Sequence, residues 1–139
     1  MNTENEIKQI VTCVNNYLEA RTEKEPMQIL NEHIRELRIC LQHAITHIVL
    51  PLTLDKAREF RLALADQLST LCDERRGNVG SGEHHHYDYC LHQIISCFEW
   101  TEQIKEEVPD DPITQQILAV DIPILRPFDY GLGKLVEKD

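Results

Sequence analysis

The sequence predicts an all-α protein: an antiparallel four-helix bundle with a short fifth helix and an extended apolar C-terminal arm. Apolar residues recur at steps of three and four along four long stretches, the spacing that places side chains on one face of an α-helix. Brief connections separate these stretches, as between antiparallel neighbours in a bundle. Aromatic residues make up only 6% of the 139 residues, and glycine and proline are few, which disfavours a β-sandwich rich in turns.

The first two helices are predicted from their start signals and apolar faces. A capping-box pattern at Thr3 and Glu6 begins the first helix. Pro26 suits the first turn of the second helix, which Pro51 ends. The predicted buried faces are Ile7, Ile10, Val11, Val14 and Leu18 in the first helix, and Leu30, Ile34, Leu37, Leu41, Ala44 or Ile45, and Ile48 in the second.

The third, fourth and fifth helices have equally local signals. Thr53 can cap the third helix, and Gly77 just beyond its last turn is a stop signal. A glycine-rich loop leads to the fourth helix, and Asp111 with Pro112 can start a short fifth helix that runs to about Val120. The predicted buried faces are Ala57, Phe60, Leu64, Leu68 and Leu71 in the third helix, and Tyr87, Cys90, Leu91, Ile94, Cys97, Phe98, Thr101 and Ile104 in the fourth.

The last segment of the chain differs from the rest. Pro123 and Pro127 prevent a continuous helix, yet the segment is rich in large apolar side chains. Burial of each such side chain is worth about 1.5–3 kcal/mol, so they are expected to pack against a surface. We expect residues 1–121 to form a helical bundle domain and residues 122–139 to pack on that bundle or on a partner subunit. The candidate partner-binding residues are Ile122, Ile124, Leu125, Phe128 and Tyr130.

The predicted second helix carries side chains that can ligate transition metals. One side of it, beside the apolar face, holds at steps of three and four the residues His33, Glu36, Cys40, His43 and His47. His43 and His47 can both reach one zinc ion, which then needs a further donor from another element. The same stripe also has a structural interpretation, as a half-polar flank between neighbouring helices or as a seam between two subunits.

The stretch EHHHYDYCLH (residues 83–92) holds four histidines and one cysteine in ten residues. In an antiparallel bundle His86 would lie level with His33, whereas His43 and His47 would lie about 15–20 Å away at a rise of 1.5 Å per residue. A site that joins all of them needs another topology or a second subunit. The hypothesis of a transition-metal site, for zinc, nickel or iron, names His33, Cys40, His43, His47 and His86.

The net charge and the absence of common catalytic motifs limit the kinds of function that the sequence supports. The formal net charge of −10 disfavours nucleic-acid binding, which needs basic surfaces. An acidic surface suits a basic protein partner, and it also admits the hypothesis of an inhibitor that imitates nucleic acid. The GxSxG, P-loop, GxGxxG and HExxH motifs are absent, so no enzyme class is indicated. The five cysteines include no CxxC pair and are expected to be mostly buried.

These observations favour a non-catalytic regulatory or adaptor protein that acts through protein–protein contacts as a homodimer. No apolar run approaches the length of about 20 residues needed to span a membrane, and the N-terminus lacks the pattern of an export signal, so a cytoplasmic location is expected. No cofactor is expected under this hypothesis. The alternative is a metal-binding helical bundle protein that uses the His/Cys stripe of the second helix.

Overall fold

The structure, a computed structural model, describes the backbone of residues 3–76 and 81–120 and, apart from 76 and 81–86, their side chains. All regular elements of these residues are helical, which confirms the all-α prediction. They are α1 (Thr3–Thr22), α2 (Met27–His43), the π-helix η1 (Ala44–Val49), α3 (Leu54–Arg76), α4 (Ser81–Glu107) and α5 (Pro112–Val120). The arm, 122–139, and its five candidate partner-binding residues lie outside the described part and remain predictions.

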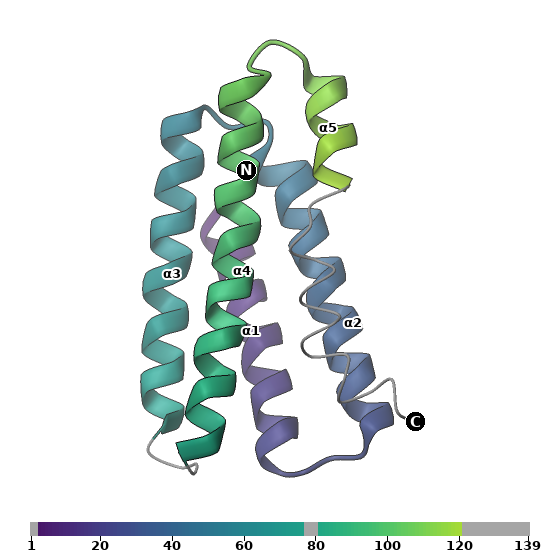
Figure 1. The fold of residues 1–139 in the computed structure, drawn as a ribbon, viewed down its shortest axis with the longest axis vertical. Helices are drawn as coiled ribbons and strands as arrows, with labels where there is room; N and C mark the ends of the chain where they lie inside the picture. The colour runs from purple at the N-terminus through teal and green to yellow at the C-terminus, as the bar shows by residue number, and fades with distance from the viewer. Residues whose placement is uncertain (1–2, 77–80, 121–139) are drawn as a thin grey trace.

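The four long helices pack into one bundle around a common core (Figure 1). Helix α3 packs along α4, α1 packs along α2, and α1 also contacts α3. The short α5 lies beside the end of α4 and touches η1. Among the residues that the structure describes, no helix is both long enough and apolar enough to cross a membrane.

Two of the predicted helix starts are confirmed by their capping contacts. The Thr53 hydroxyl accepts a hydrogen bond from the backbone N–H of Lys56 at 3.3 Å, at the start of α3. Asp111 Oδ1 accepts one from the backbone N–H of Thr114 at 3.1 Å, at the start of α5. Hydrogen bonds from Thr114 lower the pKa of Asp111, because they stabilise its carboxylate form. Both residues satisfy N–H groups that have no partner within the helix.

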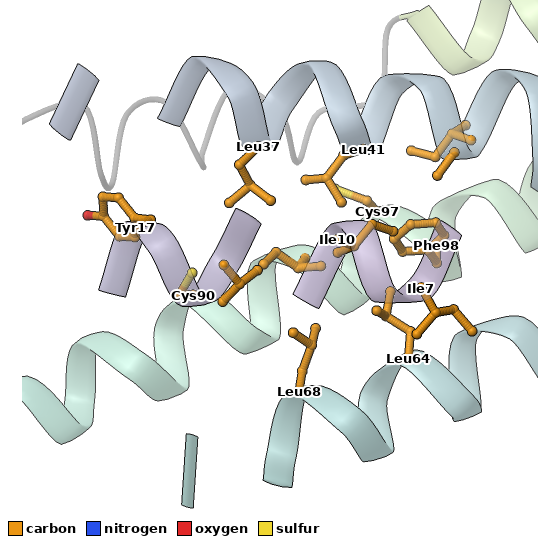
Figure 2. Close-up of a cluster of buried hydrophobic side chains, with 14 of the residues drawn as sticks. Ile7, Ile10, Tyr17, Leu37, Leu41, Leu64, Leu68, Cys90, Cys97 and Phe98 are labelled. Carbon is orange, nitrogen blue, oxygen red and sulfur yellow. The ribbon is translucent and has the colours of Figure 1, made fainter. Parts of the chain in front are cut away.

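Most residues of the predicted apolar faces form the core (Figure 2), whereas Val11, Leu71 and Leu91 are half-buried at its edge. Ile10 of α1, Leu37 of α2, Leu64 of α3 and Ile94 of α4 are fully enclosed, so every long helix contributes its own face. Tyr17 is also fully enclosed, although the apolar stripe predicted for the first helix did not include it. At about 1.5–3 kcal/mol for each large side chain, this burial is the main source of stability in the bundle.

The π-helix η1 changes how the end of the second predicted helix meets the core. The backbone N–H of Leu50 donates to the carbonyl of Ile45 at 3.0 Å, five residues back, instead of four. The wider turn keeps adjacent residues on the inner side, and both members of two pairs are buried: Ala44 with Ile45, and Ile48 with Val49. Sequence periodicity had required a choice between Ala44 and Ile45, and the structure buries both.

Charged side chains connect the helices at the edge of the core. Arg61 of α3 donates hydrogen bonds to both carboxylate oxygens of Glu102 of α4, at 2.5 and 3.3 Å. Lys105 is buried, and its ammonium donates to the carbonyl of Leu50 at the end of η1. Burial lowers the pKa of Lys105, since it disfavours the charged form. These contacts satisfy polar groups that the packing of α4 removes from water.

We expect Arg61→Met to lower the free energy of unfolding by about 2 kcal/mol, because it leaves Glu102 enclosed without its two-pronged partner. The loss is smaller than for a fully buried pair, since Arg61 is 22% exposed and Arg58 Nε lies 3.6 Å from Glu102 Oε1. The matched control is Lys56→Met in the exposed pair with Glu59, where a change within about 0.5 kcal/mol is expected. Urea unfolding measures both, and equal effects of the two substitutions would contradict the assignment.

Candidate functional site

A groove of about 680 Å³ runs between α1 and α2 and is lined in part by titratable side chains. We call it the α1–α2 groove. Its lining combines carboxylates, thiols and an imidazole with one strongly exposed apolar side chain, Ile39. The described lining residues are Glu6, Lys8, Gln9, Thr12 and Cys13 of α1, and Glu36, Ile39, Cys40 and His43 of α2.

A carboxylate–imidazole contact closes one end of this groove. Glu6 Oε1 of α1 lies 3.0 Å from His43 Nδ1 of α2. The Glu6 side chain is only 9% exposed, whereas that of His43 is 54% exposed. The imidazole therefore gives an enclosed carboxylate a hydrogen-bond partner at the mouth of the groove. The capping-box pattern predicted a contact of Glu6 within its own helix and did not reveal this contact with α2.

Two thiols meet further along the groove. Cys13 of α1 and Cys40 of α2, both half-buried, are close enough for a hydrogen bond between their side chains. Burial raises the pKa of Cys40 to about 12. Burial also raises the pKa of Cys13, the hydrogen bond from Cys40 partly offsets that rise, and the charge of Glu36 adds to it. Both thiols are therefore protonated at neutral pH, and neither is prepared to act as a catalytic nucleophile.

A second groove, of about 470 Å³, lies on the other side of Ile39 and is basic in character. Its described lining comes from α2 and η1 alone and includes Arg35, Arg38 and His47. His43 lines both grooves, and its ring centroid lies 4.9 Å from that of His47. The predicted proximity of these two histidines is therefore present in the structure, with both side chains exposed.

The structure places the described candidate metal ligands at two separate locations. Cys40 and His43 share the α1–α2 groove, and His47 adjoins His43. His33 lines a separate groove with Glu19 and Glu23. The side chain of His86 lies outside the described ones. In the part of the chain with described side chains, no group of three or more His, Cys, Asp or Glu residues is placed to hold a metal ion. The donors described here do not complete a metal site, so that hypothesis needs ligands from elsewhere.

A third feature is an apolar stripe on α5. Ile113, Ile117 and Val120 are spaced by four and three residues, so they share one face of this helix. They are 72%, 64% and 70% exposed, respectively. The opposite face is anchored, since Ala119 and Gln115 are buried and the Gln115 amide donates to the carbonyl of Val108 at 2.6 Å. We call these three residues the α5 stripe.

Comparison with known proteins adds no further assignment. No protein family, curated protein or solved structure matches this chain.

Two of the residues that shape the candidate site were not predicted by sequence reasoning. The capping-box pattern accounts for Glu6 only within its own helix, and Cys13 is one of the five cysteines expected to be mostly buried. Each lies on the flank of the apolar face of α1, and a flank residue faces the neighbouring helix. That position is the only signal in the sequence that could have indicated a contact with α2.

We expect His43→Ala to lower the free energy of unfolding by about 1–2 kcal/mol, because it leaves the enclosed Glu6 carboxylate without this partner. His47→Ala is the matched control and should change it by no more than about 0.5 kcal/mol. Both substitutions remove the contact between the two imidazole rings, so the difference between them reports the contact with Glu6. Chemical denaturation at neutral pH measures both variants. If His47→Ala lowers the free energy of unfolding as much as His43→Ala does, the contact between Glu6 and His43 does not contribute to stability.

Proposed function

We propose that this protein is a non-catalytic regulatory or adaptor protein of the cytoplasm that acts through protein–protein contacts as a homodimer. In this proposal the four long helices form an antiparallel bundle that serves as a rigid support. The contact surface is the α5 stripe together with the arm that follows it in the sequence. The proposal involves neither a cofactor nor nucleic acid.

The observation that carries the proposal is the exposure of the α5 stripe. Three large aliphatic side chains on one face of a short helix are 64–72% exposed. Single exposed apolar residues are common on protein surfaces, but a contiguous group is typical of interaction sites. The stripe is rigidly placed, because Gln115 and Ala119 fix the other face of α5 against the bundle.

The sequence that follows supports the same location. The arm begins at Ile122, two residues after Val120, and its apolar candidates are Ile122, Ile124, Leu125, Phe128 and Tyr130. Stripe and arm are thus adjacent along the chain and alike in chemistry. Two further observations support a non-catalytic role: burial raises the pKa of both thiols in the α1–α2 groove, and the Glu6 carboxylate is engaged with His43.

We expect Ile117→Lys to weaken self-association at least about tenfold, because a contact that buries the stripe would have to bury a charge, at a cost above about 1.4 kcal/mol. Sedimentation velocity of the full-length protein over a range of concentrations measures the effect. The matched control is Leu62→Lys on α3, an isolated residue that is 59% exposed, for which no change is expected.

Two results would contradict the proposed homodimer. One is a parent protein that is monomeric at all concentrations, and the other is an Ile117→Lys variant that associates as the parent does. Truncation after Val120 then separates the two parts of the surface. If the truncated protein still associates, the contact lies on α5. If truncation abolishes association although the α5 stripe is intact, the contact lies on the arm.

Metal binding is the second candidate function, and the observation that favours it is the proximity of the His43 and His47 rings, at 4.9 Å. Two imidazoles can supply half of a tetrahedral zinc site, and the remaining donors would have to come from His86 or a second subunit. We expect purified, untagged protein under this hypothesis to contain stoichiometric zinc, nickel or iron and to lose thermal stability on addition of a chelator. Substoichiometric metal together with an unchanged melting temperature would contradict it.

A further inference from the structure

The two half-buried cysteines of the described residues face each other across the seam between α1 and α2. Cys13 and Cys40 lie within hydrogen-bonding distance of one another, and both line the α1–α2 groove. The groove, of about 680 Å³, is large enough to admit a small solute to the sulfur atoms. The other three cysteines, Cys72, Cys90 and Cys97, are buried.

A second pair of thiols provides a comparison within the same molecule. Cys72 of α3 lies close enough to Cys90 of α4 to affect its ionisation. Both side chains are enclosed, with exposed fractions of 2% and 1%. This pair has the same chemistry as Cys13 and Cys40 but lacks access from a groove. Any reagent that distinguishes the two pairs therefore reports accessibility.

We propose that Cys13 and Cys40 form an oxidisable dithiol, which a peroxide-class two-electron oxidant closes into a disulfide between α1 and α2. In the first step the Cys13 sulfur attacks one oxygen of hydrogen peroxide and the O–O bond breaks. The departing hydroxide takes up the thiol proton as water, which leaves a sulfenic acid on Cys13. In the second step the Cys40 sulfur attacks the Cys13 sulfur, the S–O bond breaks, and the second water carries the proton of Cys40.

The hydrogen bond between the thiols assigns the order of these steps. The Cys40 thiol donates to Cys13 and so favours the thiolate form of Cys13, the nucleophilic form. Cys40 retains its proton more strongly and becomes the resolving thiol, already in contact with the sulfur that it attacks. Burial opposes ionisation of both thiols and so slows both steps, but the contact between the two sulfurs makes the second step intramolecular. The resulting disulfide needs the sulfurs to move from contact to about 2.05 Å and would tie α1 to α2.

The test uses full-length, untagged, reduced protein treated with hydrogen peroxide at neutral pH. Samples are alkylated under denaturing conditions, and intact mass and peptide mapping follow. We expect two of the five thiols to become protected, with one cross-linked peptide pair that joins Cys13 to Cys40. Cys72, Cys90 and Cys97 should remain open to alkylation. We also expect the Cys40→Ser variant to accumulate a dimedone-reactive sulfenic acid at Cys13, whereas Cys72→Ser should close the disulfide as the parent does.

Three outcomes would overturn the proposal. The first is that all five thiols stay reduced under conditions that fully oxidise dithiothreitol. The second is that the Cys72–Cys90 pair closes as fast as the Cys13–Cys40 pair, since access would then not decide reactivity. The third is that Cys13 or Cys40 forms only intermolecular disulfides. The peptide map of the parent protein gives the decisive result even if a serine variant fails to fold.

Discussion

Each long helix of this protein has one apolar face to bury, and α1 lies where those faces meet. It packs along α2 and also contacts α3, with Ile10 and Tyr17 fully enclosed. The interior that results is largely apolar at its centre, so polar groups enclosed at its edges need hydrogen-bond partners. Glu6 finds His43, and Glu102 finds Arg61. The inter-helix polar contacts of the described residues are therefore consequences of the packing of the apolar faces.

The candidate functional features lie where that packing is incomplete. The α1–α2 groove lies between the flanks of two helices, and thiols, carboxylates and an imidazole line it. The α5 stripe arises for a different reason. A short helix of nine residues can fix one face against the bundle, and its other face stays in solvent. The two features suit different partners. The α1–α2 groove suits a small reactive solute, and the α5 stripe suits a protein surface.

Helix positions and core faces could be predicted from the sequence because they depend on local signals. Thr53 and Asp111 cap the helices that follow them, and most of the apolar residues at steps of three and four are buried. The π-helix was not predictable from periodicity. Its hydrogen bond between residues five apart accompanies the packing of four side chains against the bundle: Ala44, Ile45, Ile48 and Val49.

In the candidate site, too, some contacts follow from the sequence and others only from the tertiary structure. The proximity of His43 and His47 follows from their spacing along one helix, so the sequence alone determined it. The contacts of Glu6 with His43 and of Cys13 with Cys40 join residues that are 37 and 27 positions apart, and only the way in which α1 packs on α2 decided them. Spacing along the sequence determines which side chains share a face of one helix, because the geometry of an α-helix is regular. Which side chains meet between helices depends on the rotation and offset of each pair, and these are set by the packing of the whole core.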